Sequence, residues 1–133
     1  MVSHSSRLKS VLLIDECPET QQVLKIILET QGFQVSVIGS TLEAVTSVSK
    51  QPPDIVMIDY EIPGESLESF VWSIQSQHPH ISIVLMGFGA DIAVRAVELG
   101  IKRYLRKPFD FLLMLDLVAK SSLQPEQQTH YVV

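Results

Sequence analysis

Short runs of apolar residues recur along the chain, about 20 residues apart, and each has the length of a β-strand. The first four runs are rich in β-branched residues, which favour strands. They are continuous rather than alternating, which is typical of strands buried on both faces of a parallel sheet. Five strands are therefore predicted, at 11–14, 35–38, 54–58, 81–86 and, from a weaker run, 102–106.

The segments between these runs have apolar residues at helical spacing. The first helix is predicted to begin near Pro18 and to end at Gly32, because proline suits a first turn and glycine the end of a helix. Its buried face is predicted to consist of Val23, Ile26, Ile27 and Thr30.

The next two helices have clear signals of their own. The stretch from Ser40 to Glu43 has the form of a capping box and predicts the start of the second helix. An apolar stripe predicts the third helix, with its buried face formed by Leu67, Phe70, Val71 and Ile74.

The fourth helix is predicted to bury Ala93, Ala96 and Val97 and to end at Gly100. Asp110 is predicted to cap the fifth helix, which runs to about Ser121. The fifth helix has more apolar residues than one buried face needs, so part of its surface is predicted to contact a partner. Phe111, Leu112, Leu115 and Val118 fall on one face, and Leu113 and Leu117 extend onto a second.

Five strand-then-helix repeats predict a doubly wound α/β domain, with a five-stranded parallel sheet and helices on both sides. We expect one domain over residues 8–123, followed by a disordered tail or truncated linker at 124–133. The whole chain has 133 residues, of which 46% are hydrophobic and 19% charged, as in a compact domain.

The formal net charge of −5 disfavours direct contact with a nucleic-acid backbone. Cys17 is the only cysteine, so no disulfide forms within the chain. No apolar run is long enough to cross a membrane, and the polar start is unlike a signal peptide. These features predict a cytoplasmic protein with no membrane contact.

Charged residues follow three of the predicted strands, at the edge where α/β sheets bind ligands. Asp15 and Glu16 follow the first strand and Asp59 ends the third. Three crowded carboxylates repel one another unless a cation joins them, and oxygen ligands suit Mg²⁺. Lys107 follows the fifth strand, and an ammonium beside carboxylates and Mg²⁺ predicts a site for a phosphoryl group.

In order and spacing, several stretches together resemble the receiver domain of two-component response regulators, the CheY-like family. The resemblance runs from about Leu8 to Leu123. The stretches are Leu13–Pro18, Pro53–Asp59 followed by Ile62–Gly64, Ala96–Gly100 and Tyr104–Phe109.

The resemblance implies that Asp59 accepts a phosphoryl group from a sensor histidine kinase or a phosphotransfer protein. It also implies a Mg²⁺ cofactor, with Asp15, Glu16, Asp59 and the backbone of Glu61 as its ligands. As a receiver, the chain is expected to be a regulator and not an enzyme.

Three further implications concern the fourth and fifth strands. Lys107 and Gly87 are expected to contact the phosphoryl group, and the bond between Lys107 and Pro108 is expected to be cis. Tyr104 matches the aromatic residue that turns inward in the active state of such domains.

The sequence departs from the family pattern at three places. Glu16 stands where the second metal ligand is usually Asp, and its longer side chain is expected to weaken the Mg²⁺ site. The loop at 64–67 is one residue shorter than the common form. Met86 stands where a Ser or Thr usually donates to the phosphoryl group, and a thioether has no proton to donate.

The substitution at Met86 is therefore expected to uncouple phosphorylation from Tyr104, and a smaller residue is expected to give the Tyr104 ring room to turn inward. The favoured function is a receiver that signals by docking, or by forming a homodimer through its fourth helix, fifth strand and fifth helix. The alternative is an atypical receiver that acts as a phosphorylation-independent interaction module. An aspartyl-phosphate hydrolase is disfavoured because Asp-x-Asp does not follow the first strand.

Overall fold

The structure is a computed structural model that describes residues 9–64 and 66–121. Strands and helices alternate, as predicted. The strands are β1 (Ser10–Ile14), β2 (Gln34–Ile38), β3 (Ile55–Asp59), β4 (Ser82–Phe88) and β5 (Arg103–Lys107). The helices are α1 (Pro18–Thr30), α2 (Thr41–Lys50), α3 (Leu67–Gln77), α4 (Ile92–Leu99) and α5 (Phe111–Ser121).

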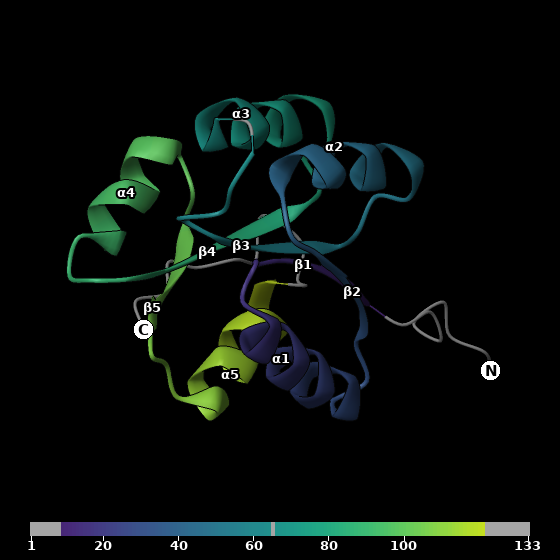
Figure 1. The fold of residues 1–133 in the computed structure, drawn as a ribbon, viewed down its shortest axis with the longest axis vertical. Helices are drawn as coiled ribbons and strands as arrows, with labels where there is room; N and C mark the ends of the chain where they lie inside the picture. Colours follow the sequence, from purple (N-terminus) through teal and green to yellow (C-terminus); the bar gives the residue numbers. More distant parts are fainter. Residues whose placement is uncertain (1–8, 65, 122–133) are drawn as a thin grey trace.

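All strands of the sheet are parallel, in the order β2-β1-β3-β4-β5. Helices α1 and α5 cover one face, and α2, α3 and α4 cover the other (Figure 1). This confirms the predicted doubly wound α/β fold. The strand order brings the carboxyl ends of β1 and β3 side by side, although 40 residues separate β1 from β3 in the chain.

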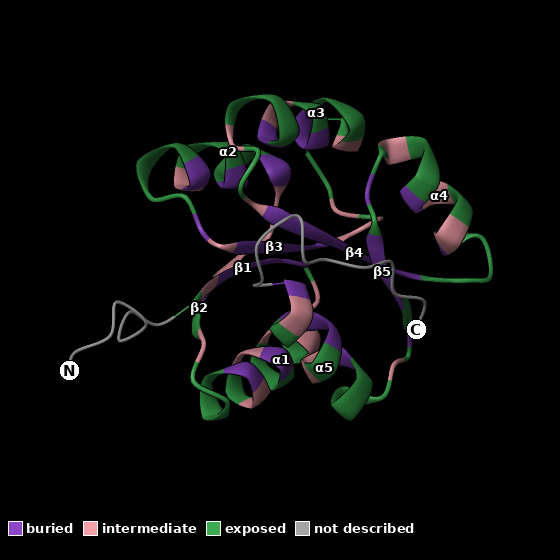
Figure 2. Ribbon diagram, turned by 180° about the vertical axis from the view of Figure 1, so that it is seen from behind, coloured by how far each residue is buried: buried purple, intermediate pink, exposed green. Residues whose placement is uncertain are grey.

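β1, β3, β4 and β5 are largely buried, the edge strand β2 is only partly buried, and the outward faces of the helices are exposed (Figure 2). Alternate residues of each strand point to opposite sides of the sheet and form two apolar cores. The core under α1 and α5 contains Leu13, Met57, Met86, Leu105 and Met114. The core under α2, α3 and α4 contains Leu12, Ile58, Phe70, Leu85 and Tyr104.

The predicted buried face of α1 is wrong for Val23, Ile26 and Thr30, whereas Ile27 is partly buried against the core under α1 and α5. Leu24 and Leu28 are its buried residues, while 42% of Val23 and 54% of Ile26 is exposed. Residues 23–28 are apolar almost all around the helix, so their periodicity is compatible with more than one face. Packing against β2 and the sheet selects the face that contains Leu24 and Leu28.

Two other helices match their predictions. Ser40 caps α2, since its hydroxyl accepts a hydrogen bond from the Glu43 N–H at 3.3 Å. Phe70, Val71 and Ile74 are the buried residues of α3, and Leu67 is partly buried against them.

Helix α4 ends at Gly100, which has the left-handed conformation expected of a glycine C-cap. Its buried residues are Ile92 and Ala96. The prediction that Val97 is buried is wrong, because 79% of this residue is exposed. The sheet covers only a narrow stripe of this short helix, and Val97 lies beside that stripe.

Asp110 caps α5, as predicted. Its Oδ1 accepts hydrogen bonds from the N–H groups of Leu112 at 2.7 Å and Leu113 at 3.3 Å. Leu113 is exposed, but Leu117 is fully buried. The prediction that both leucines lie on a free face is therefore wrong for Leu117, which packs beside Met114 in the core under α1 and α5.

The predicted domain ends at residues 8 and 123, and the predicted tail at 124–133, lie outside the described residues. Within the described ranges, no helix has the length and apolar character needed to span a bilayer.

Candidate functional site

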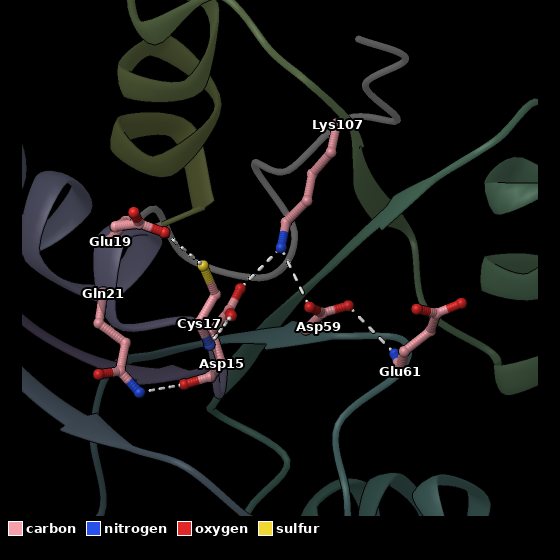
Figure 3. Close-up of polar contacts among 7 residues, drawn as sticks. All are labelled: Asp15, Cys17, Glu19, Gln21, Asp59, Glu61 and Lys107. Carbon is pink, nitrogen blue, oxygen red and sulfur yellow. Dashed lines mark hydrogen bonds and ion pairs between the residues drawn. The ribbon is translucent and has the colours of Figure 1, made fainter.

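The site lies at the carboxyl-terminal edge of the sheet, where β1, β3 and β5 end. Asp15 directly follows β1, Asp59 is the last residue of β3, and Lys107 is the last residue of β5. The Lys107 ammonium lies 2.7 Å from Asp15 Oδ2 and 3.0 Å from Asp59 Oδ2, as Figure 3 shows. One lysine thus bridges two carboxylates that come from neighbouring strands.

Asp15 is held rigidly at the base of the site. Its side chain is fully buried, and both carboxylate oxygens have donors. Oδ1 accepts a hydrogen bond from the Cys17 N–H at 2.9 Å, and Oδ2 accepts one from Lys107. The side-chain amide of Gln21 donates to the main-chain oxygen of Asp15, which ties the first helix to the end of β1 (Figure 3).

Asp59 is the more accessible carboxylate, with 18% of its side chain exposed. Its Oδ1 accepts a hydrogen bond from the Glu61 N–H at 3.1 Å, and its Oδ2 accepts one from Lys107. Of the two carboxylates, only Asp59 is therefore accessible from the surface.

Lys107 is a buried cation whose charge is compensated by its two partners. Burial alone lowers the pKa of Lys107, but the hydrogen bonds and charges of Asp15 and Asp59 outweigh this and raise the pKa above its ordinary value. The Phe88 ring centroid lies 5.7 Å from the ammonium, a cation–π distance. The peptide bond between Lys107 and Pro108 is cis.

The structure does not bring Glu16 into the cluster. Its side chain is exposed at the surface after β1. Across residues 9–64 and 66–121, no three His, Cys, Asp or Glu side chains are grouped closely enough to hold a metal ion. The carboxylate oxygens of Asp15 and Asp59, which already converge on one cation, are the donors that fit Mg²⁺.

Gly87 is buried next to Met86 near the end of β4. A Cβ atom at Gly87 would lie 2.7 Å from Ile92 Cδ1 and 3.4 Å from Tyr60 Cβ. The absence of a side chain therefore lets the first turn of α4 approach the strand closely.

Met86 is opposite Asp59 in the pairing of β3 with β4, so it occupies the position next to the site. It is fully buried in the core under α1 and α5. Tyr104 is also buried, but it packs in the core under α2, α3 and α4. The expectation that a smaller residue at 86 would give Tyr104 room is wrong, because the two side chains occupy different faces of the sheet.

Several site residues were missed by reasoning from the sequence. Gln21 and the Cys17 N–H position Asp15, and Phe88 borders Lys107. A polar residue in a first helix, or a backbone group, has no sequence signal that identifies such a role. Phe88 directly follows Gly87 after the fourth apolar run, and this position is the one signal in the sequence that could have placed it near the site.

An apolar cavity of about 280 Å³ adjoins the site. It lies between α1 and the start of α5, and Lys107 is one of its lining residues. Its apolar lining includes Val23, Leu24, Phe88, Phe109 and Phe111.

Residues 11–119 match a family model described as the response regulator receiver domain. Two curated relatives illustrate the similarity. The response regulator protein FleR of Pseudomonas aeruginosa is 30% identical over 115 residues, which cover 85% of this chain and 24% of FleR. The DNA-binding response regulator MtrA of Mycolicibacterium smegmatis is 31% identical over 101 residues, which cover 74% of this chain and 44% of MtrA. The chain thus spans less than half the length of either relative.

A solved structure of a putative response regulator from Chloroflexus aurantiacus superposes with a TM-score of 0.79. The two chains are 24% identical, and the match covers 87% of this chain and 98% of the other. At this identity the similarity supports the fold.

Proposed function

Since this chain belongs to the response regulator receiver domain family, we propose that Asp59 accepts a phosphoryl group from a sensor histidine kinase or a phosphotransfer protein. The observation that carries the proposal is the ion-pair bridge from Lys107 to Asp15 and Asp59. The partly exposed carboxylate of Asp59 lies beside the ammonium of Lys107, so a phosphoryl group bound to Asp59 would be close to this cation.

In the proposed reaction, an Asp59 oxygen bonds to phosphorus while the bond from phosphorus to the donor histidine nitrogen breaks. The nitrogen keeps the electron pair of that bond, and the product is an aspartyl phosphate. The Lys107 ammonium then pairs with the new phosphoryl oxygens in place of the Asp59 carboxylate, and it keeps its ion pair with Asp15. Asp15 keeps the ammonium positioned throughout.

We propose that Asp15, Asp59 and the backbone of Glu61 hold Mg²⁺, with Glu16 joining through its longer side chain. When bound, Mg²⁺ supplies positive charge that neutralises the phosphoryl oxygens. Because the exposed side chain of Glu16 is one methylene longer than the usual Asp and fits the strict geometry of Mg²⁺ less well, we predict weak Mg²⁺ binding that Glu16→Asp strengthens several-fold. NMR shifts at Asp15 and Glu61 during Mg²⁺ titration would measure this, and equal affinity in both proteins would contradict it.

The phosphorylation proposal is tested with acetyl phosphate and Mg²⁺, followed by intact mass. We expect the parent to gain one phosphoryl group and Asp59→Asn to gain none. Asp116→Asn, which alters an exposed aspartate on α5, is the matched control and should behave as the parent does. No gain in the parent would contradict the proposal and favour the phosphorylation-independent interaction module.

For the output, we propose protein contact through the surface of α4, β5 and α5, including formation of a homodimer. Val94 and Val97 on α4, and Leu112 and Leu113 on α5, are exposed apolar residues that support this proposal. We further propose that the domain is a cytoplasmic regulator rather than an enzyme and does not itself contact nucleic acid. The acidic net charge of −5 supports the last point.

A further inference from the structure

Three phenylalanine rings line the apolar cavity that lies between α1 and the start of α5. The rings of Phe109 and Phe111 meet edge to face, with their centroids 6.0 Å apart and their planes at 88°. Phe88 lines the cavity from the end of β4 and is 68% exposed, and Phe111 is 44% exposed. Two large apolar side chains therefore remain in contact with solvent around a hollow, which is typical of a surface that binds a ligand.

The size of this cavity limits what it can hold. Its volume is about 280 Å³, whereas pockets for drug-sized ligands have about 300 to 1,000 Å³. Val23, Leu24 and Pro108 complete its apolar lining. A molecule with a single ring fits this volume and would bury its apolar surface against these side chains.

The charged groups around the cavity determine which polar group such a ligand would carry. Lys107 and Glu19 are the charged lining residues in the described part of the chain. The Lys107 ammonium is already bound to Asp15 at 2.7 Å and to Asp59 at 3.0 Å. Three carboxylates against one ammonium leave a net charge of −2 beside the cavity at neutral pH. This charge favours a cationic ligand over an anionic one.

Aromatic rings and a carboxylate together are groups that recognise an organic cation. The Phe88 ring already has one cation at this distance, since its centroid lies 5.7 Å from the Lys107 ammonium. An oxygen of the Glu19 carboxylate is directed at the Cys17 sulfur, 3.8 Å away (Figure 3). A thiol is a weak donor, so the Glu19 carboxylate keeps its capacity to pair with an ammonium.

We propose that this cavity is a binding site for a small organic amine. The apolar body of the amine lies among Phe88, Phe109 and Phe111, and its ammonium pairs with Glu19. Asp59 does not line the cavity, so amine binding and phosphorylation can each succeed or fail without the other.

Three probes with the same phenyl ring and a short chain separate the effect of charge from that of shape. They are phenethylamine, phenethyl alcohol and hydrocinnamate, which are cationic, neutral and anionic at neutral pH. Each is titrated into the full chain at constant ionic strength and without Mg²⁺, and NMR follows the ring signals of Phe88, Phe109 and Phe111. We expect saturable shifts, with phenethylamine bound about fivefold more tightly than hydrocinnamate or better.

Glu19→Gln tests the charged end of the proposed site. It should weaken phenethylamine binding by about threefold and leave the binding of phenethyl alcohol unchanged. Glu29→Gln is the matched control, because Glu29 is an exposed acid on the same helix that pairs with Lys25 and does not line the cavity. This control should bind all three probes as the parent does.

Phe111→Ala tests the aromatic end. It should weaken the binding of phenethylamine and phenethyl alcohol several-fold, because both lose contact with the ring. Leu112→Ala is its control, since Leu112 is an exposed neighbour on α5 that does not line the cavity. Phe88→Ala changes a more exposed ring and tests the same site if Phe111→Ala does not fold.

The proposal is overturned if the parent shows no saturable shift with phenethylamine, or if hydrocinnamate binds as tightly as phenethylamine. It is also overturned if Glu19→Gln keeps the parent's affinity for phenethylamine. Unchanged phenethylamine affinity in both Phe111→Ala and Phe88→Ala would place the probe elsewhere on the molecule and overturn the proposal as well.

Discussion

At the scale of single residues, Lys107 determines the electrostatics of the proposed phosphorylation site. Its ammonium serves two carboxylates, one fully buried and one partly exposed. Removing one partner of a buried ion pair leaves the other charges uncompensated, which is strongly destabilising. The site and the fold therefore depend on the same contact.

The raised pKa of Lys107 predicts how stability depends on pH. A group whose pKa is higher in the folded state contributes stability that is complete below its unfolded pKa and is lost as pH rises through the folded value. The free energy of unfolding should therefore fall above about pH 10. Chemical denaturation across this range should show a smaller decline in Lys107→Gln than in the parent.

The control for this measurement is Lys120→Gln, because Lys120 forms an exposed ion pair with Asp116. Its alkaline decline should match that of the parent. The assignment to Lys107 would be contradicted if Lys107→Gln lost stability with pH as steeply as the parent does.

Met86 is a second residue whose effect depends on burial. Met86→Thr removes side-chain volume from the core under α1 and α5 and places a hydroxyl there. We expect a loss of about 2 kcal/mol or more in unfolding free energy. Met86→Leu, which conserves volume, should cost less than about 1.5 kcal/mol.

The same variant tests the separation of Met86 from Tyr104. Because the two side chains lie in different cores, the Tyr104 ring should stay buried in Met86→Thr, with its NMR signals unchanged by the substitution. A large shift of those signals would mean that the cores are coupled through the sheet.

At the scale of elements, α5 combines a buried face with an exposed one. Leu113→Lys changes a residue that is 52% exposed, so it should leave the melting temperature nearly unchanged and reduce self-association. Leu117→Lys places a charge at a fully buried position and should unfold the domain. Sedimentation and thermal melts would measure both effects. Unchanged association in Leu113→Lys would exclude this face as the dimer surface.

Helix α4 is linked to the proposed phosphorylation site by contacts that do not involve Tyr104. Tyr60 follows the proposed phosphoacceptor, and its N–H donates to the Met86 carbonyl at 2.7 Å. The Arg95 guanidinium of α4 lies 5.5 Å from the centroid of the Tyr60 ring. These contacts connect the end of β3 to α4 without the hydroxyl that position 86 lacks.

At the scale of the whole molecule, this connection predicts how far a signal travels. Beryllofluoride, a mimic of the aspartyl phosphate, should shift NMR signals around Asp59 and in α4. Arg95→Gln should reduce the α4 shifts and leave those around Asp59 intact, because it removes the contact with Tyr60. It also removes the exposed ion pairs of Arg95 with Asp91 and Glu98, which lie at the N-cap of α4 and within the helix. Arg106→Gln is the control, and equal α4 shifts in all three proteins would rule out this connection.

The fold and the centre of the site follow largely from the sequence. Continuous apolar runs predict buried parallel strands. Capping residues predict where α2 and α5 begin, and a glycine predicts where α4 ends. Because parallel strands end at a common edge, the positions of Asp15, Asp59 and Lys107 predict that they meet. All of these signals are local, so each can be read without knowing how the helices pack.

Only the tertiary structure decided which apolar face of α1 is buried, because residues around much of that helix are hydrophobic. It also decided that Met86 and Tyr104 lie in separate cores, that Glu16 faces outward, and that Arg103 is buried with donors unmet by the described residues. These outcomes depend on how each helix is rotated against the sheet and which side chains it covers. Such packing depends on residues that are far apart in the chain, so it cannot be predicted from a local sequence pattern.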